Sequence, residues 1–281
     1  MKVDTGGVSN LGSPVNGLPH IPTEIIGGAK VAALTRRETA RHMVDAALKA
    51  RGREVPATVC SSVNGQVISE LYTKANRREI AEQLARVFIV SVDGQPLVFA
   101  SKLLGGGGVR ERCATTDLFH DVAEIAVEKG LTFYMLGASA EENKLAVDNA
   151  KRQHPGLSII GSRDGYFSSA AEEQAVVDEL NRLKPDFVWV SMGFPQELEF
   201  CNRWCAVLTN VGVMKTSGGL FNFLSGTRSR APGWMQAAGL EWAYRLYLEP
   251  RRLFVRYAAS NIVATWLLLT KTERYSSRQS A

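Results

Sequence analysis

The chain has 281 residues, of which 45% are hydrophobic and 22% are charged, as in a soluble globular protein that buries a sizeable core. This composition excludes a collagen, a low-complexity disordered chain and a small disulfide scaffold. The formal net charge is +5, and the segment 228–281 accounts for it with nine basic and three acidic residues. We therefore expect one large, nearly neutral domain followed by a basic C-terminal segment.

The four cysteines and four histidines show no pattern of metal ligands or disulfides. Cys201 and Cys205 lie one helical turn apart, but no histidine or acidic cluster accompanies them at ligand spacing. No secretory signal peptide precedes the cysteines, which indicates a reducing cytosol. We predict no metal site and no cofactor, and we interpret the cysteines as small buried hydrophobic residues.

In chain order, residues 1–22 come first and are rich in Gly, Ser, Asn and Pro without an apolar period, so we expect a flexible leader. After it, short apolar runs alternate with longer amphipathic stretches. The pattern predicts helices at 35–51, 66–84, 118–129, 140–154 and 170–183, and strands at 55–62, 87–92, 131–136, 157–160 and 186–191. Thr35 and Glu38 are consistent with a capping box at the start of the first helix. This alternation is typical of an α/β fold in which helices cover both faces of a parallel sheet.

Polar residues and glycines directly follow several of the predicted strands. They are Ser62 and Asn64, Asp93 with Gly94, Gly137, and Gly193 with Pro195. Because ligands bind at the carboxyl ends of the strands in open parallel sheets, this layout is typical of a nucleotide-type site. The chain contains neither a GxGxxG nor a Walker A motif, and we interpret the glycines from 105 to 108 as a flexible loop.

The segment 228–281 interleaves arginines with aromatic and aliphatic residues. Pro250 prevents one continuous helix, so the pattern predicts amphipathic helices at 233–248 and 251–271. The apolar run 257–270 is too short for a membrane span and is interrupted by Asn261. Two interpretations are open on the pattern alone: the helices lie at an anionic membrane surface, or they pack on the sheet with their arginines in solvent.

Several short strings occur in one order and spacing along the second half of the chain. They are His154–Leu157, Ile160-Gly161, Asp164–Phe167, Pro185–Val188, Gly193–Glu197, Gly219, Phe221, Phe223–Gly226, Arg230–Pro232, Trp234, Gly239–Leu246, Glu249–Leu253 and Arg256-Tyr257. In this arrangement they resemble the WecG/TagA/CpsF glycosyltransferases, over about residues 25–257.

The resemblance implies an inverting, metal-independent bacterial enzyme that moves a hexosyl residue from a UDP-sugar donor to a polyprenyl-diphosphate-linked acceptor. The process would be exopolysaccharide or cell-surface polysaccharide synthesis at the cytoplasmic face of the cell membrane. The implied organisation is a Rossmann-like glycosyltransferase domain at 23–227 and a helical, membrane-facing C-terminal appendage at 228–281. If the appendage closes over the site only at the membrane, it would exclude water there and complete the catalytic set.

The resemblance also assigns roles to single residues. Asp93 matches the position of the general base proposed for the family. The role is chemically reasonable, since a carboxylate near an acceptor hydroxyl can accept its proton as the oxygen attacks the anomeric carbon. Arg245, Arg252 and Arg256 match arginines of the appendage, whose guanidinium groups can stabilise the charge gained by the leaving UDP. The expected substrate-binding residues are Ser62, Asn64, Arg112, Asp117, Gly137, Tyr166, Gln196, Glu197 and Asn222. Gly137 is included because it directly follows a predicted strand.

Three departures from the family pattern motivate an alternative function. Thr115 replaces a usual glycine, Asn222 replaces a usual aspartate, and one residue is missing between Pro195 and Gln196. The alternative is a catalytically weakened nucleotide-sugar-binding or assembly partner of a polysaccharide synthesis complex. A nucleic-acid-binding module would leave the long motif match unexplained. The expected partners are therefore a UDP-sugar donor, a polyprenyl-diphosphate-linked acceptor and an anionic membrane surface, without nucleic acid, and a homo-oligomer is left open.

Overall fold

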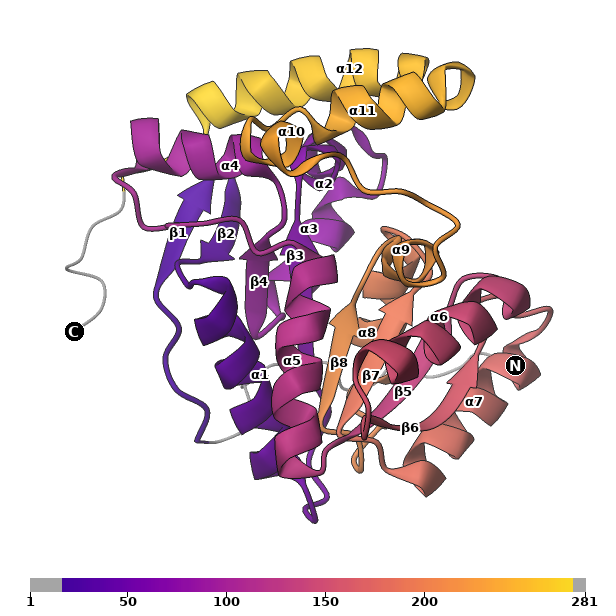
Figure 1. Cartoon of the computed structure of the whole chain (residues 1–281). Coiled ribbons are helices and arrows are strands. Elements are labelled where there is room, and N and C mark those ends of the chain that lie inside the picture. Colours follow the sequence, from indigo (N-terminus) through magenta and orange to yellow (C-terminus); the bar gives the residue numbers. More distant parts are fainter. Residues whose placement is uncertain (1–16, 275–281) are drawn as a thin grey trace, which may run out of the picture.

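The computed structural model describes residues 17–274, without the side chains of residues 252, 253 and 255–258. Its centre is a six-stranded sheet with the strand order β4-β3-β8-β7-β5-β6, and every neighbouring pair is parallel. Figure 1 shows helices on both faces of this sheet and the C-terminal helices across one end. The strands are β3 Thr58–Val63, β4 Ile89–Val92, β5 Thr132–Gly137, β6 Ser158–Arg163, β7 Phe187–Ser191 and β8 Val213–Thr216.

Two groups of helices cover the sheet. The first group is α1 Arg36–Ala50, α5 Thr115–Lys129, α6 Ala140–Gln153 and α9 Leu220–Leu224. The second group is α2 Gly65–Thr73, α3 Arg77–Ala85, α7 Ala170–Leu183 and α8 Gln196–Trp204. A short antiparallel hairpin, β1 Thr23–Ile26 with β2 Ala29–Ala32, lies beside β4, and α4 Gln95–Ala100 continues into a π-helical turn, Ser101–Gly105.

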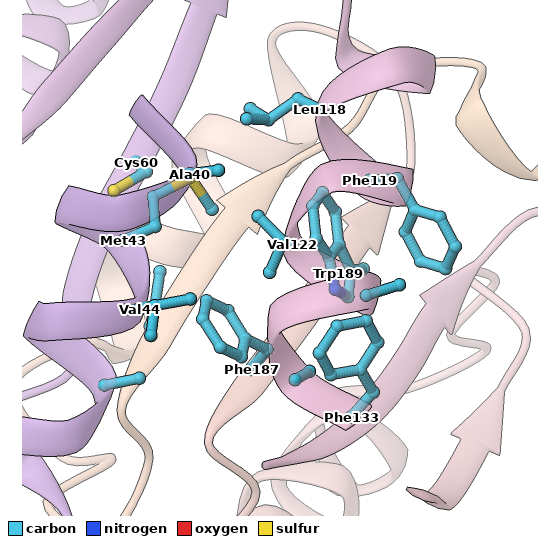
Figure 2. Packing of buried hydrophobic residues seen from close by; sticks show 14 of the residues in the cluster. Ala40, Met43, Val44, Cys60, Leu118, Phe119, Val122, Phe133, Phe187 and Trp189 are labelled. Carbon is cyan, nitrogen blue, oxygen red and sulfur yellow. The ribbon is translucent and has the colours of Figure 1, made fainter. Parts of the chain in front are cut away.

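Alternating side chains of the strands fill the two sides of the core. Phe133 of β5 and both Phe187 and Trp189 of β7 face the cluster formed with α1 and α5, as Figure 2 shows. Tyr134 and Val188, one residue further along each strand, belong to the cluster on the opposite face. This alternation follows from the two-residue period of a strand, and burial on both faces explains why these strands are almost entirely apolar.

The α/β fold class predicted from the sequence is confirmed, and most element positions agree. The capping box predicted at the first helix is present, with Thr35 and Glu38 exchanging hydrogen bonds at the start of α1. The predicted helix 66–84 is instead two helices, α2 and α3, which are separated at residues 74–76. The sequence pattern missed the hairpin, α4, α8, β8 and α9, because each is too short to show a period of its own.

The C-terminal segment forms three helices that lie over the carboxyl ends of β3 and β4 (Figure 1). They are α10 Gly233–Ala237, α11 Glu241–Leu248 and α12 Pro250–Thr270. Gly239, which has a positive φ of 74°, separates α10 from α11, so the predicted helix 233–248 is interrupted there. Within residues 17–274, no helix has both the length and the apolar character that a membrane crossing requires.

The predicted leader falls largely outside the described residues, which begin at position 17. The part that is described joins the main domain, because Ile21 is buried in the core and Pro22 accepts a hydrogen bond from the Ala33 amide.

Candidate functional site

A pocket opens where the carboxyl ends of β3, β4 and β8 meet the C-terminal helices. Six of the predicted catalytic and substrate-binding residues line it: Ser62, Asn64, Asp93, Arg112, Glu197 and Arg245. Its opposite wall comes from α11 and α12 and includes Trp242 and Asn261. The C-terminal segment therefore covers the sheet end in this structure, and its side chains form part of the pocket.

Asp93 is held at the end of β4 by contacts to both of its carboxylate oxygens. Its backbone amide donates to the Val63 carbonyl of β3 at 2.8 Å, which fixes where the residue leaves the sheet. The Oδ1 atom accepts from Nε and Nη2 of Arg112 at 3.3 and 3.1 Å. The Oδ2 atom accepts from the Thr115 amide at 3.1 Å, at the first residue of α5. The carboxylate is thus oriented from two sides and still faces the pocket.

The bond from Thr115 to Asp93 uses a backbone amide, which a glycine at that position would also supply. The Thr115 hydroxyl adds a contact to the Ser62 hydroxyl at 3.3 Å. Replacement of the usual glycine by Thr115 therefore leaves the support of Asp93 in place.

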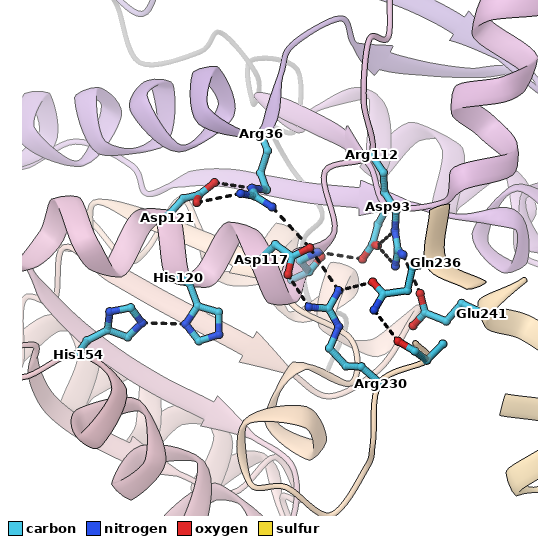
Figure 3. A network of polar contacts seen from close by, with 12 residues as sticks. Arg36, Asp93, Arg112, Asp117, His120, Asp121, His154, Arg230, Gln236 and Glu241 are labelled. Carbon is cyan, nitrogen blue, oxygen red and sulfur yellow. Dashed lines mark hydrogen bonds and ion pairs between the residues drawn. The ribbon is translucent and has the colours of Figure 1, made fainter. Parts of the chain in front are cut away.

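Arg112 connects Asp93 to the C-terminal segment. Its Nη1 atom lies 2.7 Å from Oε2 of Glu241 on α11, as Figure 3 shows, and Glu241 also accepts from Arg245 at 3.3 Å. Burial alone would lower the pKa of Arg112, but the nearby carboxylates of Asp93 and Glu241 raise it above its ordinary value. Arg245 in turn lies over the ring of Phe223, with its guanidinium carbon 5.2 Å from the ring centroid.

Glu197 and Lys215 form a buried charged layer beneath the pocket. The Glu197 carboxylate accepts from the backbone amides of Gly218 and Gly193, and burial raises the pKa of Glu197 to about 7. Lys215 of β8 is fully buried and donates to the Thr216 carbonyl at 2.6 Å. Burial lowers the pKa of Lys215, while Cys113, Cys60, Glu197 and Asp93 act in the opposite direction.

Asn64 lines the pocket but also has a structural task. It is the N-cap of α2, and its Oδ1 atom accepts from the Val67 amide at 3.1 Å. Its Nδ2 group and the second lone pair of Oδ1 are therefore the atoms with which Asn64 can perform its predicted role in substrate binding.

Asp117 and Gln196 lie outside the lining of the pocket. Asp117 forms a bidentate ion pair with Arg230, which also donates a hydrogen bond to Gln236 (Figure 3). Nη1 of Arg36 lies 3.6 Å from Oδ2 of Asp117. Burial alone would raise the pKa of Asp117, but these arginines lower it. Asp117 thus anchors the start of the C-terminal segment. Gln196 is exposed at the start of α8, one residue before Glu197.

Gly137, Tyr166 and Asn222 also lie outside the pocket lining, toward the β5 and β6 end of the sheet. Gly137 ends β5 with a φ of 140°, and a Cβ atom there would lie 2.3 Å from the Ser191 carbonyl oxygen. Tyr166 is 74% exposed after β6. Asn222 donates to Glu142 at 2.6 Å, a contact that two carboxylates at these positions could not make while both are ionised.

The side chains of Arg252 and Arg256 fall outside the part of the structure that is described, so their predicted roles stay predictions. Conversely, Lys215, Glu241, Gln236 and the Thr115 amide were not predicted as parts of the site. The only sequence signal for Lys215 is a charge inside the apolar run Val213–Thr216. Glu241 lies in a string typical of the family, but nothing in the sequence indicates that it contacts Arg112.

A parallel sheet that opens on a pocket lined by three carboxylates and two guanidinium groups defines an α/β protein with a polar ligand site at the carboxyl ends of its strands. The model of the glycosyl transferase WecG/TagA/CpsF family matches residues 24–278, and the chain belongs to this family. The family predicted from the sequence strings is thereby confirmed.

Two curated relatives are N-acetylglucosaminyldiphosphoundecaprenol N-acetyl-beta-D-mannosaminyltransferases. The protein of Bacillus subtilis (strain 168) is 29% identical over 194 residues, which cover 69% of this chain and 73% of the relative. The protein of Bacillus spizizenii (strain ATCC 23059 / NRRL B-14472 / W23) is 32% identical over 160 residues, which cover 57% of this chain and 60% of the relative.

Proposed function

We propose that this protein is an inverting, metal-independent glycosyltransferase that transfers a hexosyl residue from a UDP-sugar to a polyprenyl-diphosphate-linked acceptor. The observation that carries the proposal is the placement of Asp93 and two guanidinium groups, those of Arg112 and Arg245, around one pocket. The family match and the names of the two relatives, which specify transfer onto a diphosphoundecaprenol-linked sugar, support the same acceptor class.

In the proposed reaction, the acceptor hydroxyl gives its proton to the Asp93 carboxylate while its oxygen forms a bond to the anomeric carbon of the donor. The bond from that carbon to the UDP oxygen breaks in the same step, so the configuration inverts and UDP leaves with the bonding electron pair. Arg112 and Arg245 would stabilise the charge on the leaving diphosphate, a task that divalent cations perform in other transferases.

The contacts around the three sequence departures favour an enzyme over the assembly-partner alternative. Thr115 supports Asp93 through its backbone, and Glu197 lines the pocket although one residue is missing before Gln196. Asn222 has a specific partner in Glu142. None of the three departures removes a group that the proposed step uses.

A membrane surface is the proposed location of the reaction, at the inner face of the cell membrane. The segment 228–274 is basic, and Arg251 on it is exposed. An apolar surface accompanies this charge, as expected for an interfacial element that meets anionic lipid. Its most exposed large side chains are Trp234, Tyr247, Phe254, Ile262, Trp266 and Leu269.

The proposal is tested by measuring UDP release from a panel of UDP-sugars with a polyprenyl-diphosphate oligosaccharide extract, in EDTA and with anionic vesicles. UDP-N-acetylmannosamine stands first in the panel because both relatives carry that sugar in their names. We expect turnover of one donor, and we expect Asp93→Asn to lower it by about 100-fold or more. UDP binding without turnover of any donor would favour the assembly partner, and activity abolished by EDTA would contradict metal independence.

A further inference from the structure

Glu241 is the point at which the C-terminal segment meets the surroundings of Asp93. Its side chain is 15% exposed and lies between two guanidinium groups that line the pocket. The Oε2 atom is 2.7 Å from Nη1 of Arg112, and the Oε1 atom accepts from Nη2 of Arg245 at 3.3 Å. Both oxygens of Glu241 are therefore used to hold cations of the site.

Arg112 is shared between two carboxylates from different parts of the chain. Its Nε and Nη2 atoms donate to Asp93 in the sheet domain, and Nη1 contacts Glu241 on α11 (Figure 3). Because the guanidinium group is planar with fixed donor directions, the contact to Glu241 determines how the remaining donors meet Asp93.

The same contact seats α11. No residue of this helix is fully buried, and only half-buried side chains such as Tyr244 and Leu246 pack it against its neighbours, so the ion pair adds a specific contact that holds it above the pocket. Loss of the ion pair between Glu241 and Arg112 would therefore free both α11 and the guanidinium group that orients Asp93.

We propose that Glu241 is a positioning residue, which holds Arg112 against Asp93 and keeps α11 over the pocket. The proposal rests on the proposed function, in which Asp93 is the general base. Glu241 acts through Arg112 and does not touch the reacting atoms. Its removal lowers the rate of transfer more than the affinity for the donor, because Arg112 and Arg245 keep their charges for the donor diphosphate.

The first test compares Glu241→Gln with the wild type in the UDP-release assay. The amide keeps the size of the side chain and removes its charge. We expect kcat to fall about tenfold while the KM for the donor stays within about twofold, and Glu241→Asp to recover part of the loss. Glu273→Gln, which removes an exposed carboxylate from the same segment, should leave both constants unchanged. An increase in KM with unchanged kcat would overturn the proposal.

A double-mutant cycle then shows whether Glu241 acts through Arg112. If it does, Glu241→Gln has no further effect on kcat in an Arg112→Ala background. An equal fall in both backgrounds would mean that Glu241 acts independently of Arg112, which contradicts the proposal.

Hydrogen exchange separates a failure of this proposal from a failure of the proposed function, because it needs no turnover. We expect Glu241→Gln and Arg112→Ala each to speed exchange of the amides in α11 to a similar extent, and the double variant to add little. Amides of α5 serve as the internal reference, and Glu273→Gln as the matched control. If the wild type releases no UDP, the exchange data still test whether Glu241 holds α11 in place. Unchanged protection of the α11 amides in Glu241→Gln would overturn the positioning role.

Discussion

The sheet domain and the first two C-terminal helices are held in place by different kinds of contact. Three apolar clusters fill the two sides of the sheet, whereas α10 and α11 have no buried residues. Their half-buried side chains pack on neighbouring helices, and two ion pairs add to this attachment, one from Arg230, just before α10, to Asp117 and one from Glu241 to Arg112. The difference separates two tasks: apolar burial supplies the stability of the fold, and a few charged contacts determine how the wall of the pocket is placed.

Helix α12 has both buried and exposed apolar side chains. Its last turns bury Leu267 and Leu268 in a cluster with α2 and the N-terminal hairpin, while Ile262 and Trp266 stay exposed. The end of α12 is therefore anchored by the core, whereas α10 and α11 are attached by partial packing and by the two ion pairs.

The largest expected difference in stability is between the loss of a tryptophan side chain from the sheet domain and the loss of one from the C-terminal helices. Trp189→Ala removes a fully buried ring from β7 and should lower the free energy of unfolding by about 3–5 kcal/mol. Trp234→Ala removes a ring that is 67% exposed on α10 and should change it by less than about 0.5 kcal/mol. Urea denaturation of both variants measures the contrast, and similar losses would show that α10 contributes to the stability of the core.

Glu197, in the sheet domain, should make the free energy of unfolding depend on pH. Burial raises the pKa of Glu197 to about 7, so the folded state binds more protons than the unfolded state between pH 4.5 and 7. The contribution of Glu197 to the free energy of unfolding therefore falls as the pH rises through this range, by about 3 kcal/mol. Glu197→Gln should remove this loss. Urea denaturation of wild type and variant at pH 5 and pH 8 tests it, and a pH-independent difference between the two proteins would contradict it.

Removal of a charged anchor should affect the C-terminal segment more than the core. Arg230→Met removes the nearest guanidinium group from Asp117 and leaves the more distant Arg36. Because Arg230 and Asp117 are both partly exposed, the free energy of unfolding should fall by only about 1 kcal/mol. Proteolysis between residues 228 and 240 should become faster while the cleavage of β5 and β7 stays unchanged. Asp117→Asn in the Arg230→Met background should add little; an additive loss would mean that the two residues are not coupled.

The smallest effect on stability is expected at the exposed apolar surface of α12. Leu269→Ser, at a side chain that is 66% exposed, should change the free energy of unfolding by less than about 0.5 kcal/mol. It should nevertheless weaken binding to anionic vesicles about fivefold, as the loss of one buried leucine at an interface predicts. Leu145→Ser on α6 is the matched control, and equal vesicle binding by both variants would exclude a membrane role for this surface.

Much of the sheet domain could be predicted from the sequence because the signals are local. Apolar runs located most of the central strands, and the Thr35–Glu38 pair located the start of α1. The polar residues at the carboxyl ends of β3 and β4 were expected to share a site, and Ser62, Asn64 and Asp93 do line one pocket. Parallel strands place their carboxyl ends at the same edge, so a pattern along the chain was sufficient for this part.

The sequence by itself determined the family, the alternation of strands and helices, and the candidate general base. The tertiary structure alone decided which of the named residues meet. Insertion of β8 between β3 and β7 places Lys215 beneath the pocket, and the path of the C-terminal segment brings Glu241 to Arg112 and Arg230 to Asp117. Strand order and the docking of a distant helix depend on contacts between residues far apart in the chain, which local periodicity does not encode.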